Sequence, residues 1–207
     1  NQYNINDKIA VGYIASVNYK YDSDYYENTI NRSVAVRNGT QQDFDAQEGE
    51  LGSIQAIASG LFGLSLKTGS FKHKATILAI RSGESNGFDG IIEDYIENPY
   101  SGVTNTMTHT QRDILTAPFS GAYRLGNKLS FDWKVAPSVV RVRDIDFRKS
   151  VFNVLPNGTR IIDNSSSALP LRLWRDLEEF GLSAKADLKY NFNLFGAEGN
   201  NLKVGFA

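Results

Sequence analysis

The chain has 207 residues, no Cys, and 22 Lys and Arg residues against 23 Asp and Glu residues, which gives a formal net charge of −1. The near-neutral charge excludes the broad basic field of nucleic-acid-binding proteins, so we expect no nucleic-acid partner. The absence of Cys and the presence of only two His exclude disulfide frameworks, thiolate nucleophiles, Cys-bearing zinc sites and multi-His metal centres, and we expect no cofactor.

Alternation of apolar and polar residues, the pattern of a strand with two different faces, recurs along most of the chain. From Ile9 to Tyr21 the odd-numbered positions are apolar or aromatic, and most even-numbered positions are polar. The same pattern returns in 53–67, 129–135 and 182–192. It predicts eight strands: roughly Lys8–Tyr21, Tyr25–Val36, Leu51–Lys67, Phe71–Ser82, Met107–Arg124, Lys128–Val142, Trp174–Phe192 and Leu202–Phe206.

The connections between these strands alternate in length. Short hairpin turns are expected at Asp22–Asp24, Thr68–Ser70, Leu125–Asn127 and Asn193–Asn201. Long polar connections rich in Gly, Asn and Asp are expected at Arg37–Glu50, Gly83–Thr106 and Arg143–Leu173. This alternation is typical of an antiparallel up-and-down meander whose two ends face different compartments.

Aromatic residues gather beside the expected short turns. Those that would lie at a membrane interface are Tyr19, Tyr21, Tyr25, Phe131, Trp133, Tyr190 and Phe192. Rings with an apolar body and a polar edge are enriched at membrane–water interfaces. The alternative is ordinary cross-strand packing of aromatic residues, which occurs in any sheet.

The length of the alternating stretches indicates a transmembrane β-barrel segment, because several exceed the 9–11 residues of a bilayer crossing. Eight strands either close alone into a narrow barrel or form an arc of a wider one. The expected lipid-facing residues include Phe131, Trp133, Leu188 and Tyr190, and the expected lumen-facing residues include Asp132, Lys134, Lys185, Asp187 and Lys189. A soluble β-sandwich that acts as a binding module remains an alternative.

Catalytic and metal-binding motifs are not convincing in this sequence. Gly83–Gly87 matches the nucleophile-elbow pattern of serine hydrolases, but no helix pattern follows it, and His109 lies too near for that fold. An acidic cluster in the first long connection, from Asp43 to Glu50, lacks the Gly and Glu positions of an EF-hand. We therefore expect no catalytic residue and no metal ligand, and the chain is not expected to be an enzyme.

Two segments resemble TonB-dependent receptors of the SusC-like branch, which carries a carboxypeptidase-like regulatory extension. The first is Leu173–Phe180, which reads LWRDLEEF and opens a long alternating strand. The second is Leu129–Ala136, which reads LSFDWKVA and follows a Gly-Asn turn. An earlier hairpin, with Leu51–Leu66 and Ile77–Gly83 as its arms, is also similar to that family, although Pro137 departs from the pattern and predicts a bulge or a strand end.

The resemblance implies that residues 1–207 are the middle part of an outer-membrane barrel in a Gram-negative cell. It further implies energised uptake of a bulky nutrient such as a glycan, a peptide or a metal chelate. The implied partners are outer-membrane lipid, the plug and remaining barrel, a TonB-type energy-coupling protein and a surface lipoprotein. Tyr95, Tyr100 and Trp174 are the expected ligand contacts, because loops on a rigid scaffold usually carry recognition. An autonomous eight-stranded barrel with a structural or adhesion role is the alternative.

Overall fold

The computed structural model describes residues 2–6, 8–37, 39–94, 100–163, 169–194 and 197–206. The strands are β1 (Gln2–Asn6), β2 (Ile9–Arg37), β3 (Thr40–Lys67), β4 (Phe71–Asp94), β5 (Tyr100–Thr116), β6 (Phe119–Leu125), β7 (Leu129–Val154), β8 (Arg160–Ile162), β9 (Leu171–Leu194) and β10 (Ala197–Phe206). The fold is all-β. Within the described ranges there is no helix that is both long enough and apolar enough to cross a membrane.

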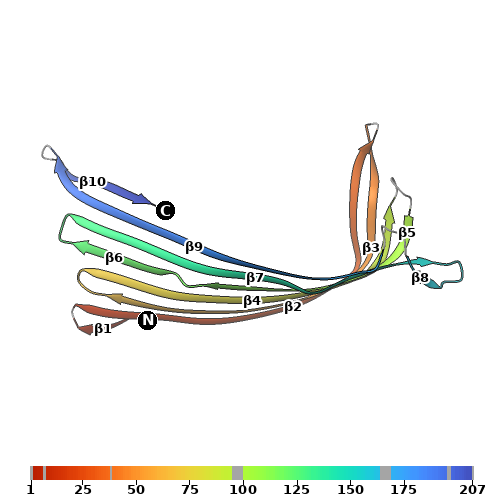
Figure 1. Cartoon of the computed structure of the whole chain (residues 1–207), viewed down its shortest axis with the longest axis horizontal. Coiled ribbons are helices and arrows are strands. Elements are labelled where there is room, and N and C mark those ends of the chain that lie inside the picture. The colour runs from red at the N-terminus through yellow and green to blue at the C-terminus, as the bar shows by residue number, and fades with distance from the viewer. Residues whose placement is uncertain are drawn as a thin grey trace.

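All strands belong to one antiparallel sheet that follows the chain in up-and-down order (Figure 1). The order across the sheet is β1-β2-β3-β4-β5-β7-β9-β10. Strand β6 continues the position of β5 between β4 and β7, and β8 pairs with the end of β7. The predicted antiparallel, all-β architecture is therefore confirmed. In the part of the chain that the structure describes, β1 and β10 form the two edges and do not pair with each other.

The first predicted turn, Asp22–Asp24, is wrong. Strand β2 runs without interruption for 29 residues, and these three residues pair in regular register with Ser53–Gln55 of β3. Asp and Ser favour turns, but the side-chain alternation continues through them and the long cross-strand pairing prevails. The chain instead reverses beyond Arg37, next to Gly39, whose φ of 75° suits a residue without Cβ.

The three long connections predicted as loops are also wrong, because most of their residues extend the strands. Strands β2, β3 and β7 have 29, 28 and 26 residues, whereas strands of globular proteins usually have 3–10. Residues 40–50 belong to β3, 83–94 belong to β4 and 100–106 belong to β5. Gly, Asn and Asp suggested loops there, but pairing of the two arms outweighs that local preference.

The turns at the other end of the sheet agree better with expectation. Thr68–Ser70 joins β3 to β4, and Gly126, with φ of 70°, lies between β6 and β7. The nine-residue turn predicted at Asn193–Asn201 is too long, because β9 continues to Leu194 and β10 begins at Ala197. We refer to this end, which contains the β3–β4 and β6–β7 turns, as the short-turn end.

One strand position is interrupted next to Pro137 of β7. The fifth predicted strand is divided into β5 and β6 at Ala117 and Pro118. The Pro137 carbonyl on β7 accepts hydrogen bonds from Ala117 N (3.0 Å) and from the Thr116 hydroxyl (3.2 Å). The bulge or strand end predicted at Pro137 is wrong, because Pro137 lies inside β7 in regular register with Leu182, and the interruption lies on the neighbouring strand.

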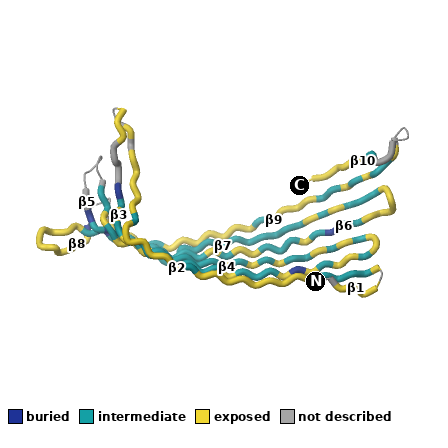
Figure 2. The backbone as a smooth tube through the Cα atoms, turned by 180° about the vertical axis from the view of Figure 1, so that it is seen from behind, coloured by how far each residue is buried: buried dark blue, intermediate teal, exposed yellow. Residues whose placement is uncertain are grey.

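The sheet is a single layer with very little core (Figure 2). Among the described residues, only Ala46 and Val151 are buried hydrophobic residues. Large apolar side chains are exposed, including Val17 (90%), Phe180 (70%) and Leu182 (64%). A soluble sandwich would bury one face of each sheet against another. Contiguous exposed apolar surface of this kind marks a surface that contacts another protein or a membrane.

Candidate functional site

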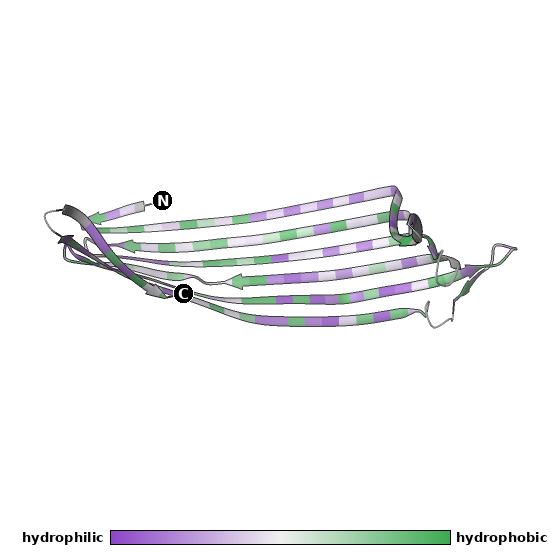
Figure 3. Cartoon of the chain, turned by 90° about the horizontal axis from the view of Figure 1, so that it is seen from above, coloured by the Kyte–Doolittle hydropathy of each residue, from purple (hydrophilic) through white to green (hydrophobic). Residues whose placement is uncertain are grey.

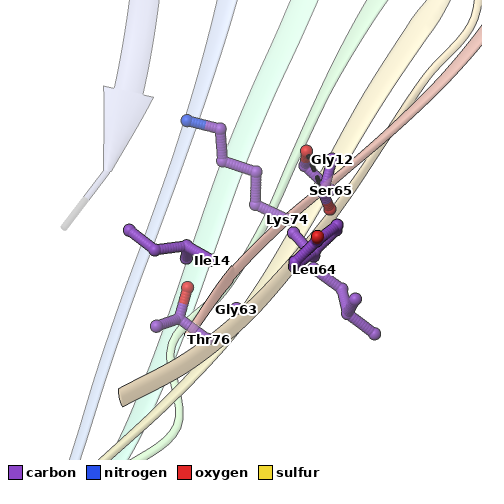
Figure 4. A pocket seen from close by; sticks show the side chains of 8 residues that line it. Gly12, Ile14, Gly63, Leu64, Ser65, Lys74 and Thr76 are labelled. Atoms are coloured by element: carbon purple, nitrogen blue, oxygen red, sulfur yellow. Dashed lines mark hydrogen bonds between the residues drawn. The ribbon is translucent and has the colours of Figure 1, made fainter. Parts of the chain in front are cut away.

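The cross-strand registers divide the side chains between two faces, because alternate residues of a strand point to opposite sides. Face A is the side that carries Ala184 of β9, and face B is the side that carries Ser183. The cross-strand row through Ala184 contains Tyr13, Leu64, Ala75, Phe119 and Val135. Figure 4 shows the division close to this row, with Ile14 and Lys74 extending from one side and Leu64 from the other.

Face A carries an apolar band next to the short-turn end. Its six successive rows contain Val11, Tyr13, Ala15 and Val17 of β2; Gly60, Phe62, Leu64 and Leu66 of β3; Phe71, His73, Ala75, Ile77 and Ala79 of β4; Leu115, Phe119, Gly121, Tyr123 and Leu125 of β5 and β6; Leu129, Phe131, Trp133, Val135, Pro137 and Val139 of β7; Phe180, Leu182, Ala184, Ala186, Leu188 and Tyr190 of β9; and Leu202, Val204 and Phe206 of β10. None of these described residues is Asp, Glu, Lys or Arg. Figure 3 shows apolar and polar positions alternating along the strands.

The height of the band can be estimated from β7. Leu129 and Val139 are ten residue steps apart (139 − 129), which corresponds to about 33 Å along a strand. Strands tilted by about 45° would make the band roughly 24 Å tall, and the apolar band of outer-membrane barrels is about 25 Å tall. At that tilt, the band on face A would be about as tall as the apolar band of an outer-membrane barrel.

Aromatic rings gather at the short-turn edge of the band. The His73 ring lies 5.3 Å from the Phe71 ring and 5.2 Å from the Tyr123 ring, measured between centroids, and the Tyr123 hydroxyl lies 3.1 Å from His73 Nε2. The Trp133 indole covers Gly121, where a Cβ would clash with Trp133 Nε1. Glycine at this position thus makes room for a large ring between two strands.

The predicted interface aromatic residues divide into two groups. Four of them lie toward the short-turn end: Phe131, Trp133, Tyr190 and Phe192. The prediction that Tyr19, Tyr21 and Tyr25 flank a short turn is wrong, because β2 is continuous there. These three lie on face A beyond the opposite edge of the band, all more than half exposed. Aromatic residues therefore lie on both sides of the band.

Face B is polar in the rows next to the short-turn end, whereas further along the same strands it also carries apolar side chains: Ile14, Leu61, Leu78, Ile80, Ile114 and Val140. The residues predicted to share this polar side do share it: Asp132, Lys134, Lys185, Asp187 and Lys189. The predicted lipid-facing residues lie on the other side of the sheet, face A: Phe131, Trp133, Leu188 and Tyr190. The Asp187 carboxylate lies 3.3 Å from Lys185 Nζ and 3.4 Å from Lys203 Nζ. The separation of the two predicted sets is confirmed.

Ion pairs replace apolar residues on face A directly beyond the band. Arg81 Nε donates to the Asp113 carboxylate at 2.6 Å, and Arg143 reaches the same carboxylate at 3.2 Å. Arg141 pairs with Glu178 at 2.5 Å. We name these five residues the ion-pair belt. Its side chains are mostly half-exposed, so each pair contributes little stability alone, but together they mark where the apolar surface ends.

A second ionic group lies further along face A. Asp146 accepts hydrogen bonds from Arg148 and from Arg172 (3.0 Å), and these bonds, led by that from Arg148, lower the pKa of Asp146 to about 2. The Arg172 guanidinium also lies over the Trp174 ring, 4.8 Å from its centroid. The carboxylate is thereby kept ionised and fixed between two strands.

Ser85, His109 and Asp146 lie in one row but do not form a catalytic triad. Ser85 Oγ is 2.5 Å from His109 Nδ1, and Asp146 is the cross-strand partner of His109. The Asp146 carboxylate, however, binds two arginines. Ser85 lies inside β4, where backbone N–H groups serve the sheet ladder and are not directed at a developing oxyanion. The strand-to-helix turn that a nucleophile elbow needs is replaced by a continuous strand.

Of the predicted ligand contacts, Tyr100 and Trp174 do not lie in one site. Tyr95 lies outside the described residues. Tyr100 opens β5 opposite Asp94, whereas Trp174 lies within β9, 61% exposed on face A and close to the row of His109. Nine residue steps of β5 separate Tyr100 from that row (109 − 100). The acidic residues predicted in loops also lie on strands, as with Glu48, which pairs with an arginine of β2.

The ion-pair belt is the feature that sequence reasoning missed. Its partners are 30–37 positions apart in the chain, and only the strand register brings them together. The sequence of β7 contains a local sign of this border. Alternate residues of the strand are apolar up to Val139 and are then charged at Arg141 and Arg143, while the alternation itself continues.

No family model matches the chain, and no curated protein matches its sequence.

Proposed function

We propose that the chain forms an arc of the wall of a transmembrane β-barrel in the outer membrane of a Gram-negative cell. Face A contacts lipid, and face B lines a wet lumen. The observation that carries this proposal is the apolar band on face A, about 24 Å tall if the strands are tilted by about 45°. The band ends at the ion-pair belt, and the opposite face carries charged side chains in the rows nearest the short-turn end. In water this single sheet would expose the band without compensation, whereas lipid tails cover it.

The edges of the sheet support an arc of a larger barrel over an autonomous eight-stranded one. Strand β1 pairs with β2 only over residues 9–12, and β10 pairs with β9 only over 186–194. The outer edges of Tyr13–Val17 and Phe180–Lys185, both within the band, have no strand partner among the described residues. Backbone groups in hydrocarbon need such partners, so further strands would pair at both edges.

The proposed orientation follows from the lengths of the two ends. Past the band, β2 continues for 20 residues from Val17 to Arg37 (37 − 17), while the other end closes in short turns. Outer-membrane barrels have short periplasmic turns and longer outer extensions. The short-turn end is therefore assigned to the periplasm, and the long hairpins to the cell surface.

The proposed activity is energised uptake of a bulky nutrient, as in the TonB-dependent receptors that two segments resemble. In that role the arc performs no chemistry. The outer hairpins would contribute to capture of a glycan, a peptide or a metal chelate, and a plug, a TonB-type coupling protein and a surface lipoprotein would be the partners. Rigid hairpins that project from a wall suit this task, because recognition is usually carried by such outer segments.

The test uses cells that produce the natural protein. It should be recovered in outer-membrane fractions, show heat-modifiable migration, and support uptake that stops when the proton gradient is collapsed. Removal of residues 156–158, in the turn between β7 and β8, should weaken nutrient binding and leave assembly intact. Recovery as a water-soluble monomer would contradict the barrel, and uptake that ignores the proton gradient would contradict the energised mechanism.

A further inference from the structure

Face B at the short-turn end places lysines directly opposite one another. Three cross-strand pairs consist of two lysines each: Lys67 with Lys72, Lys134 with Lys185, and Lys189 with Lys203. Like charges at directly opposed positions destabilise a sheet. Asp187, which pairs with Lys185 and Lys203, offsets part of the repulsion from within the sheet. Three such pairs in adjacent rows still leave an excess of positive charge, which favours a further counter-charge from outside the sheet.

The charge balance of this surface differs from that of the whole chain. Lys74 and Arg124 lie in the same three rows, which gives eight cations, while Asp132 and Asp187 are the carboxylates of those rows. The three rows therefore carry a net charge of +6 (8 − 2). Since the chain carries −1, its remainder carries −7 (−1 − 6). We name these eight cations the lysine face.

The lysine face is broad and shallow. It extends over six strand positions from β3 to β10, or about 24 Å, and its three rows span about 14 Å along the strands. A hollow of about 460 Å³ adjoins it, and Gly12, Ser65 and Thr76 line this hollow together with the extended Lys74 side chain (Figure 4). Lysines offer mobile point charges and no rigid fork, which suits a run of carboxylates spread over a surface more than one small anion.

We infer that the lysine face docks an acidic polypeptide segment within the lumen, near its periplasmic mouth. The choice of protein over lipid rests on the proposed function, which places lipid against face A. A free phosphate or a single sugar acid would neutralise one pair only, whereas a chain with several Asp and Glu residues can reach all three pairs. The adjoining hollow gives its side chains room against the sheet.

Zero-length cross-linking tests this inference in outer membranes that contain the natural full-length protein. A carbodiimide joins a lysine amine to a carboxylate only when the two are in contact. We expect peptides in which Lys74, Lys134 or Lys185 is joined to Asp or Glu of one acidic segment, and we expect these amines to resist acetylation. Lys128, in the β6–β7 turn, is the matched control and should be acetylated.

Neutralisation of Lys134 alone provides the second readout, because it leaves the Lys185–Asp187 ion pair in place. If Lys134 and Lys185 simply repel each other, the K134Q variant should unfold at a higher temperature than the natural protein. If an acidic segment binds them, the variant should unfold at a lower temperature, and the difference should shrink at high salt. The inference would be overturned if all three lysines are freely acetylated or if the variant is more stable than the natural protein. It would also be overturned if the lysines are protected but form no cross-links, which would point to a polyanionic glycan. Where face A is independently found in lipid, these results overturn the inference and leave the barrel standing.

Discussion

The matched substitutions Ala184→Arg and Ser183→Arg test which face of the sheet contacts lipid. The two residues are neighbours on β9, both are exposed, and both are small. They differ in their face, since Ala184 lies opposite Val135 in the apolar band and Ser183 opposite Ala136 on face B. Strand propensity and side-chain entropy are therefore nearly the same for the two variants.

The expected magnitude follows from the depth of Ala184. It lies six residue steps from Tyr190 and four from Phe180, or about 20 Å and 14 Å along the strand, which is close to the middle of the band. Arg at the midplane of a barrel's lipid face costs about 2–4 kcal/mol, a change of roughly 30- to 700-fold in the folding equilibrium. Arg at an exposed wet position changes stability by about 0.5 kcal/mol or less.

The assay is denaturant titration of the natural protein and the two variants in lipid vesicles, under conditions where unfolding is reversible. The free energy of unfolding should fall by about 2–4 kcal/mol in Ala184→Arg and should stay close to the natural value in Ser183→Arg. Equal losses for the two variants, or a larger loss for Ser183→Arg, would refute the assignment of face A to lipid.

Three further outcomes follow from the structure. The pKa of Asp146 is lowered from 3.8 to about 2, so its ion pairs stabilise the fold above pH 4, and this stability is lost as the pH falls toward 2. When unfolding is measured between pH 5 and 2, the Asp146→Asn variant should lack this part of the pH dependence. Gly121→Val should displace the Trp133 ring, lower the free energy of unfolding by about 1–3 kcal/mol and shift the tryptophan emission. Gly60→Ala is the control and should change neither quantity, because no atom lies within 4 Å of the new Cβ. Similar effects of the two substitutions would argue against the packing of Trp133 on Gly121. With an impermeant thiol reagent on intact cells, Asn157→Cys should be labelled and Ser70→Cys protected, and the reverse pattern would invert the orientation.

Local patterns in the sequence predicted the strands where alternation was clean. In 129–135 and 182–192 every apolar residue shares one parity, and both stretches are strands with the predicted faces. Asp22–Asp24 misled because turn preference is a property of single residues. Pairing of these residues with Ser53–Gln55, which decides the conformation, depends on the register of the whole β2–β3 hairpin.

The candidate site was less accessible from the sequence than the fold was. Arg81, Asp113 and Arg143 attract no notice separately, because charged residues are common in polar segments. They meet only once β4, β5 and β7 are aligned. The three Lys–Lys pairs of the lysine face likewise follow from register alone. The change from apolar Val139 to charged Arg141 at alternate positions of β7 is a local sign of the border, and Phe180 and Glu178 show the same change on β9.

Accessibility of spin labels along β9 tests the central claim most directly. Single Cys residues placed at each position from 180 to 190 in the natural protein, in lipid vesicles, would carry the label. We predict that labels at even positions are accessible to oxygen, most strongly near Ala184 and Ala186, and that labels at odd positions are accessible to a water-soluble nickel complex. Nickel access at both parities, or no alternation between them, would contradict a sheet whose face A lies in the bilayer.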